Sequence, residues 1–97
     1  MRSRLPCRKD ANHNELAGVF ESLGCSVLDL SMVGDDCPDI LVGIAAVNVL
    51  VEIKSATGKL EPGQERFKRD WNGPCEVCRT ADEAIALVQK YRARMRR

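Results

Sequence analysis

The sequence predicts an α/β fold: a mixed β-sheet flanked by helices, in the order helix, three strands, helix, strand, helix. Three observations lead to this prediction. Apolar residues recur at helical spacing near both ends, runs rich in Val and Ile fill the middle, and a helical segment separates the third run from a fourth. A hairpin followed by a helical crossover puts antiparallel and parallel strand pairs into one sheet. We expect a single domain over residues 1–97, with basic, flexible ends at 1–9 and 92–97.

The N-terminal half predicts one helix and three strands. A helix is expected over residues 11–23, with an apolar face formed by Leu16, Val19, Phe20 and Leu23, and Gly24 as its cap. Residues 25–30 alternate like a half-buried strand, and a loop follows over 31–38. Residues 39–44 and 48–54 predict two strands, which the short connection 45–47 would join as a hairpin.

The C-terminal half predicts two helices around a short strand. Pro62 suits the first turn of a helix that runs to about Trp71, where the Asn72-Gly73 pair ends it. A strand is expected over 75–79. Thr80 and Glu83 form a capping box that opens the last helix. Its expected apolar face comprises Ala84, Ile85, Val88, Tyr91 and Met95.

Charge is unevenly distributed along the chain. The formal net charge is only +1, from 15 basic and 14 acidic residues. Nine of the basic residues lie in segments 1–9 and 90–97, which hold no acid, so residues 10–89 carry a net charge of −8. An acidic body with basic ends suits a protein that holds divalent cations centrally and a polyanion at its margins. Alternatively, the terminal arginines are solvated tails that aid solubility.

No segment predicts a membrane span or export. No apolar run approaches the roughly 20 residues that a span needs, and no apolar segment follows the basic N-terminus. We therefore expect a soluble, intracellular protein whose five cysteines are reduced. Cys75 and Cys78 have the spacing of half a zinc site, but the other candidate ligands are scattered (Cys7, His13, Cys37). We interpret the pair as packing residues rather than zinc ligands or a redox motif.

Three charged residues on the predicted hairpin indicate a chemical site. Side chains alternate along a strand, so Glu52 and Lys54 project from the same face. Charges on a central strand demand an explanation, because such strands are normally apolar on both faces. Asp39 begins the neighbouring strand, which would bring its carboxylate near Glu52. Two such carboxylates repel each other unless a cation lies between them, and oxygen ligands suit Mg²⁺ or Mn²⁺.

Three further groups fit such a site alongside Lys54. The backbone carbonyl of Ile53 is a candidate third metal ligand, and Lys54 could orient or deprotonate an attacking water, which suits phosphodiester hydrolysis. Gln64 shares the expected core-facing side of the second helix with Phe67 and Trp71, so we expect it to contact the Lys54 ammonium or the water. Glu15, at the edge of the first helix's apolar stripe, either adds a third carboxylate or is simply solvated.

The Pro38-Asp39 pair, the Glu52-x-Lys54 motif and Gln64 together resemble the signature of the PD-(D/E)XK nuclease superfamily. The element order resembles that superfamily's restriction-endonuclease-like core. The segment 71–79 and the capped helix after it resemble the virus-type replication-repair nuclease (VRR-NUC) family. This resemblance spans roughly residues 12–87. One departure is the pair of cysteines in a strand that tends to be aliphatic in the family.

The resemblance implies roles for these residues. Asp39 and Glu52 would ligate the metal, Lys54 would serve the nucleophile, Gln64 would support the site and Glu15 would be the acid of the first helix. The implied activity is that of an Mg²⁺-dependent, structure-selective DNA endonuclease, with Mn²⁺ as a substitute. It would work in the cytoplasm of a bacterial or phage-infected cell.

Branched DNA is the expected substrate. Stand-alone members of the family resemble junction resolvases, and a twofold dimer doubles a small DNA-binding surface and places two cuts symmetrically. We therefore expect a homodimer that nicks four-way (Holliday) junctions. Phosphate contacts would come from the basic ends and from Lys9, Lys59, Arg66 and Lys68. The alternatives are a monomeric nuclease selective for flaps or single strands, a noncatalytic nucleic-acid-binding module, and a zinc-redox module.

Overall fold

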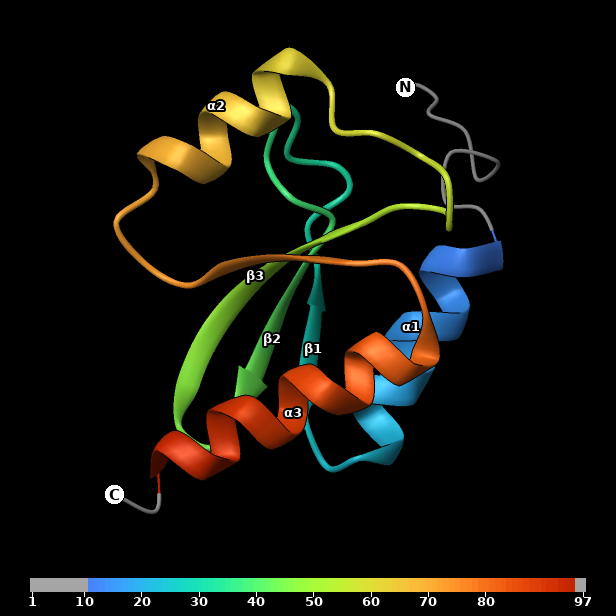
Figure 1. Cartoon of the computed structure of the whole chain (residues 1–97), viewed down its shortest axis with the longest axis vertical. Helices are drawn as coiled ribbons and strands as arrows, with labels where there is room; N and C mark the ends of the chain where they lie inside the picture. The colour runs from blue at the N-terminus through green and yellow to red at the C-terminus, as the bar shows by residue number, and fades with distance from the viewer. Residues whose placement is uncertain (1–10, 96–97) are drawn as a thin grey trace.

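A computed structural model of the chain describes residues 11–95 and contains the seven predicted elements in the predicted order (Figure 1). Their bounds are α1 Ala11–Ser22, β1 Ser26–Asp29, β2 Ile40–Ile44, β3 Val47–Ile53, α2 Pro62–Asp70, β4 Cys75–Cys78 and α3 Ala81–Met95. The predicted α/β class and element order are confirmed. Lys9, Cys7 and the other residues of the basic N-terminal segment, with Arg96 and Arg97, lie outside the described residues.

The four strands form one mixed sheet in the order β1-β2-β3-β4. β1 pairs antiparallel with β2 and β2 antiparallel with β3, whereas β4 runs parallel to β3 after the α2 crossover. The register places Ile40 opposite Val51 and Glu52 opposite Val77. β3 therefore lies between β2 and β4, and its backbone pairs with both strands.

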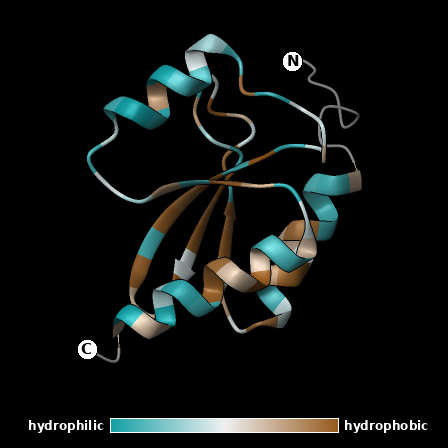
Figure 2. Ribbon diagram, viewed as in Figure 1, coloured by the Kyte–Doolittle hydropathy of each residue, from teal (hydrophilic) through white to brown (hydrophobic). Residues whose placement is uncertain are grey.

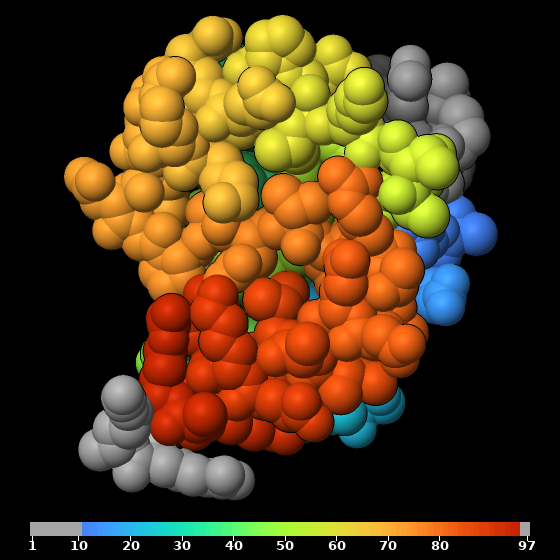
Figure 3. All heavy atoms as spheres, viewed as in Figure 1, coloured from blue at the N-terminus to red at the C-terminus, as the bar shows by residue number. Residues whose placement is uncertain are grey.

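The apolar core lies between one face of the sheet and the helices α1 and α3. These two helices lie side by side, and the strands that they cover are predominantly apolar (Figures 1 and 2). Alternation along the strands directs one set of side chains into this layer, and Leu16, Phe20, Val42, Val49, Val51, Val88 and Tyr91 are among its buried members. α2 lies apart from this layer, near the end of β3, and forms its own part of the surface (Figure 3).

Two expected apolar faces are wrong in part. In α3 the buried side chains are Ala84, Leu87, Val88 and Tyr91, whereas Ile85 is 37% exposed and Met95 is 60% exposed. The buried set follows the i, i+3, i+4, i+7 stripe, from which Ile85 is rotated away. No side chain of α2 is buried, and Trp71 at its end is half exposed, because this mostly hydrophilic helix does not pack on the apolar layer (Figure 2).

The hairpin turn is shorter than expected. Ala45 and Ala46 alone connect β2 to β3, both with positive φ (50° and 69°), and β3 begins one residue earlier than predicted, at Val47. Two consecutive positive φ values define the turn that matches the twist of a tight hairpin, where Asn-Gly is the usual sequence. Here two alanines adopt it at some cost in backbone strain.

Cys78 is fully buried in β4 and Cys75 at its start is half-buried, as expected of packing residues. Within residues 11–95 there is no group of three or more His, Cys, Asp or Glu side chains arranged to hold a metal ion. In the same range, no helix has the length and apolar character that crossing a bilayer would require.

Candidate active site at the end of strand β3

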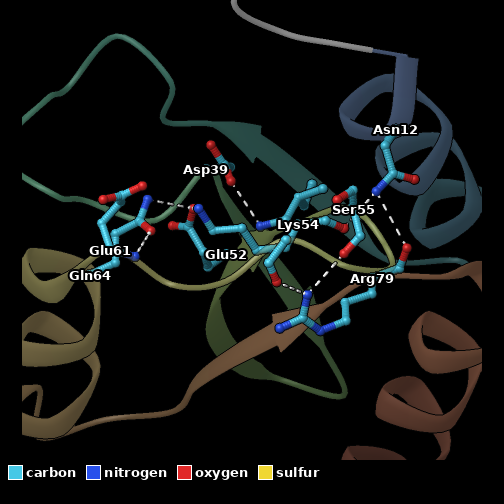
Figure 4. Close-up of polar contacts among 10 residues, drawn as sticks. Asn12, Asp39, Glu52, Lys54, Ser55, Glu61, Gln64 and Arg79 are labelled. Atoms are coloured by element: carbon cyan, nitrogen blue, oxygen red, sulfur yellow. Dashed lines mark hydrogen bonds and ion pairs between the residues drawn. The ribbon is translucent and has the colours of Figure 1, made fainter.

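Asp39 immediately precedes β2, at the point where β2 and β3 cease to pair. The last paired residues are Ile40 and Val51, so the Ile53 N–H, two residues further on, has no strand partner on that side. The Asp39 carboxylate takes that place and accepts a hydrogen bond of 2.8 Å from the Ile53 N–H (Figure 4). On its other side, the Asp39 carbonyl accepts a 2.8 Å bond from the Leu30 N–H. These two bonds fix the carboxylate against β3.

Glu52 is a buried carboxyl group beside Asp39. Only 6% of the residue is exposed. Burial, repulsion by Asp39 and a hydrogen bond with the Asp39 carboxyl group together raise the pKa of Glu52 to about 8, with Lys54 acting in the opposite direction. The predicted proximity of the two acids is therefore present. Near neutral pH the pair retains a proton unless a cation compensates the second negative charge.

Lys54 follows β3 directly and extends its register, since its N–H donates to the Cys78 carbonyl at 3.1 Å. Its ammonium lies 3.9 Å from Glu52 Oε2, and its side chain is 18% exposed. The predicted alternation therefore holds: Glu52 and Lys54 project from the same side of the strand. A mostly buried cation beside Glu52 is held close to any group that this carboxyl group binds.

Gln64 enters the site from the first turn of α2. Its Oε1 accepts a 2.9 Å hydrogen bond from the Glu61 N–H, and its Nε2 donates to Glu52 Oε2 at 3.0 Å (Figure 4). Because only the amide oxygen can accept from an N–H, the first bond determines that the NH₂ group faces Glu52. The contact of Gln64 is thus with Glu52 rather than with the Lys54 ammonium.

A loop acid that was not predicted also approaches the site. Asp36, with a φ of 64°, lies so close to the first turn of α2 that a Cβ on Gly63 would be 2.3 Å from its Oδ2. Its charge adds to the effects that raise the pKa of Glu52. The loop composition had suggested a turn, but nothing in its sequence indicates contact with a helix 27 residues further on.

Two polar side chains hold the backbone that follows Lys54. Asn12 Nδ2 donates to the Lys54 carbonyl at 2.8 Å and to the Arg79 carbonyl at 3.3 Å (Figure 4). The Arg79 guanidinium donates to the Ser55 carbonyl at 2.9 Å and to the Gly58 carbonyl. These bonds connect α1, the end of β3 and the end of β4, and the sequence offers no local signal for either residue.

Comparison with known proteins agrees with this geometry. No protein-family model matches the sequence, and no curated protein matches it. A solved structure described as a "VRR_NUC domain" matches with a TM-score of 0.65 and 27% identity, over 87% of this chain and 97% of that chain. The chain is thus similar in fold and in sequence to a VRR-NUC domain. The predicted resemblance to the VRR-NUC family and the restriction-endonuclease-like fold are confirmed, and the match supports a nuclease of this kind.

The other predicted site residues do not join this cluster. Glu15 is exposed on α1 and forms no hydrogen bond or ion pair with Asp39, Glu52 or Lys54, so the structure does not bring it to the pair. Its role stays a prediction. Lys59, Arg66 and Lys68 are exposed, on the loop before α2 and on α2 itself. Exposure is what phosphate contacts require.

The donor set of the candidate site fits a hard divalent cation. Asp39 and Glu52 offer carboxylate oxygens, the ligand type that Mg²⁺ and Mn²⁺ prefer. Mg²⁺ retains several waters and is often held by only one or two carboxylates, so the absence of a third acid from the described cluster is compatible with it. Burial and the repulsion by Asp39 raise the pKa of Glu52, and a bound cation would oppose both effects by stabilising the ionised pair.

Proposed function

We propose that this protein is an Mg²⁺-dependent, structure-selective DNA endonuclease that acts as a homodimer and nicks four-way junctions. One observation carries the proposal: Asp39 before β2, Lys54 after β3 and Gln64 in α2 converge on Glu52. The Gln64 amide and the Lys54 ammonium lie 3.0 Å and 3.9 Å from the same Glu52 oxygen. The family resemblance implies that it works in the cytoplasm of a bacterial or phage-infected cell.

Asp39, Glu52 and the Ile53 carbonyl would hold the cation, with Mn²⁺ able to replace Mg²⁺. In antiparallel pairs the N–H and C=O of a strand residue point to the same neighbour, and the Ile53 N–H points to Asp39. Its carbonyl is therefore expected on the same side. When bound, the cation supplies positive charge to the phosphodiester transition state and lowers the pKa of water.

The protein's own side chains would orient the reactants. The Lys54 ammonium, held beside Glu52, would position the attacking water and the phosphate oxygens. Gln64 would keep the Glu52 carboxylate in one orientation, since the Glu61 N–H fixes the amide that donates to it. Fixed geometry of this kind is the main means by which a site accelerates phosphoryl chemistry.

DNA would be bound largely through its phosphates. Lys59, Arg66 and Lys68 are exposed and flank the site on the α2 side. Contacts of this type position the DNA backbone without reading its sequence. Removing one of them should reduce the slope of log K against log salt concentration by about one. Lys9, in the N-terminal segment outside the described residues, is proposed for the same role.

Apolar side chains at one edge of the sheet support self-association. Leu28 on the edge strand β1 is 57% exposed, and Met32 and Val33 in the following loop are 79% and 59% exposed. Clustered exposed apolar residues next to an open strand edge are typical of interaction sites. Leu28→Lys should shift a dimer to monomer in sedimentation analysis, whereas Ile85→Lys on α3, also an exposed apolar position, should not.

Cleavage assays test the catalytic proposal. Labelled four-way junction, flap, single-stranded and duplex substrates are incubated with Mg²⁺, Mn²⁺ or chelator. Asp39→Asn and Lys54→Ala should reduce junction cleavage by about 100-fold or more, and Gln64→Ala by about 10- to 100-fold. Asp82→Asn, which removes an exposed acid from α3, is the matched control and should be neutral.

Three results would overturn parts of the proposal. Junction cleavage by Asp39→Asn at the parent rate would remove the catalytic assignment. A monomer that prefers flaps would replace the junction resolvase with a flap-selective enzyme. Calorimetry that finds no Mg²⁺ or Mn²⁺ binding dependent on Asp39 and Glu52 would favour a noncatalytic nucleic-acid-binding module.

A further inference from the structure

Two aromatic side chains at the end of α2, the half-buried Phe67 and the exposed Trp71, lie outside the apolar core. The rings of Phe67 and Trp71 stack with their centroids 5.3 Å apart and an interplanar angle of 12°. Trp71 is 50% exposed, and α2 buries no side chain at all. Burial in the core therefore does not account for a stacked aromatic pair on this hydrophilic helix. An exposed aromatic face is a surface on which another flat ring can stack.

The aromatic pair lines a surface hollow of about 340 Å³, together with Asp36, Gly63, Arg66 and Asp70. A second hollow of about 290 Å³ adjoins it and is lined by Asp70, Trp71, Asn72 and Gly73. The Gly73 backbone lies close to the indole, since a Cβ on Gly73 would be 2.9 Å from Trp71 Nε1. The first volume is at the lower end of the range for pockets that bind small organic groups.

We propose that this hollow binds an unpaired nucleobase of the substrate, stacked on the Trp71 side; the inference rests on the proposed nuclease function. The charges of the lining favour a base over a phosphate as the occupant. Asp36 and Asp70 would repel a phosphate, although Arg69 partly neutralises Asp70 through a 2.8 Å ion pair. Carboxylates can accept hydrogen bonds from the amino and imino groups of bases. Arg66 is the cation available for the adjoining phosphate.

The helix relates this hollow to the candidate active site. Gln64, Phe67 and Trp71 are spaced i, i+3, i+7, so the aromatic pair continues the stripe that begins at the Gln64–Glu52 contact. Seven residues of helix correspond to about 10 Å. At 3.4 Å per nucleotide along one strand, the stacked base lies about three nucleotides from the scissile phosphate. Selectivity for branched or unpaired DNA would follow, because a base within a duplex is not available for stacking.

Trp71 is the single tryptophan of the chain, so the protein's tryptophan fluorescence reports whether a base stacks on it. In chelator, where cleavage is excluded, a 12-nucleotide single strand should quench Trp71 fluorescence saturably. An oligonucleotide of the same length with abasic central positions carries the same phosphates and should quench little. Equal quenching by both strands, or quenching by Mg²⁺ alone, would overturn the proposal, the latter in favour of a cation site.

Variants give the second test. Trp71→Ala and Phe67→Ala should weaken binding of the single strand at least about fivefold, and Trp71→Phe should retain most of it. Binding of a fully paired duplex should not change. Circular dichroism should show an intact fold, because neither ring is buried. Undiminished single-strand binding by Trp71→Ala would overturn the inference.

The two proposals fail separately. If Trp71→Ala binds and cuts like the parent while Asp39→Asn is inactive, the base-binding site is wrong and the nuclease stands. If the parent cuts no substrate, the nuclease proposal fails, yet the fluorescence titration still determines whether the hollow binds a base.

Discussion

The side-chain amide of Asn12 donates a 2.8 Å hydrogen bond to the main-chain carbonyl of Lys54, 42 residues away in the sequence. The same amide reaches the Arg79 carbonyl at 3.3 Å. Asn12 therefore joins the ends of β3 and β4 to α1 at the point where the site lysine leaves the sheet. The direction of the Lys54 side chain depends on a residue that makes no contact with the carboxylates.

Asn12→Ala should lower junction cleavage about tenfold and the free energy of unfolding by about 1 kcal/mol, because a part-buried carbonyl loses its donor. If Asn12 positions Lys54, the loss falls on kcat with little change in KM for DNA. Asn14→Ala, exposed on the same helix, is the control and should be neutral. A loss of stability with unchanged kcat would reduce Asn12 to a purely structural role.

The Glu52 carboxyl should make the stability of the metal-free protein fall with rising pH. Its pKa is raised to about 8 in the folded state from an ordinary value of 4.5, so between these limits the folded state binds more protons than the unfolded state. The free energy of unfolding then decreases with pH through that window, by at most about 1.4 kcal/mol per pH unit for one group.

Thermal unfolding in chelator from pH 4.5 to 8.5 measures this effect. Glu52→Gln should flatten the decline, whereas Asp82→Asn should leave it in place. Added Mg²⁺ should raise the Tm more at pH 8 than at pH 5, because it binds the ionised pair. Parallel profiles for the parent and Glu52→Gln would contradict the prediction.

Gly63→Ala should displace α2 from the loop that carries Asp36. A Cβ there would lie 2.3 Å from the Asp36 carboxylate, so the helix or the loop must move, and the Gln64–Glu52 bond is lost. Cleavage should fall about 10-fold or more. Adding Asp36→Gly, which suits the positive φ at that position, should restore much of it. Gly18→Ala, with open space around the new Cβ, should be active and about 0.5–1 kcal/mol more stable.

Ala46→Gly in the hairpin turn should stabilise the protein by about 1 kcal/mol, because glycine adopts a φ of 69° without the clash that alanine suffers. Denaturant unfolding measures the change. The same substitution at Ala93, exposed in α3, should destabilise by about 1 kcal/mol. Effects of the same sign at both positions would show that backbone strain is not the cause.

The elements and the central pair of acids were predictable because their signals are local. Periodicity and caps gave all seven elements, and strand alternation alone placed Glu52 and Lys54 on one side of β3. Asp39 followed from the hairpin, since adjacent antiparallel strands bring sequence neighbours together.

The rest depends on contacts between distant segments. Asn12 and Arg79 become part of the site only when α1 meets the ends of β3 and β4, and no local pattern reports such a meeting. Trp71 was expected on a core face and is half exposed. Helical spacing shows that residues share one side of a helix, but it does not show whether that side faces the core or the solvent. Glu15 lies on the solvent-exposed side of α1, which is one of the two alternatives that its position at the edge of the stripe left open.

Helix α2 brings Gln64 to Glu52 yet contributes no buried side chain to the domain. Little apolar surface opposes its detachment, so it can open as a local unit while the sheet and the other two helices remain folded. Amide protons of residues 62–70 should accordingly exchange far faster than those of β3. Detachment would also carry the Gln64 amide away from Glu52, so the candidate site would be complete only while this helix is docked on the sheet.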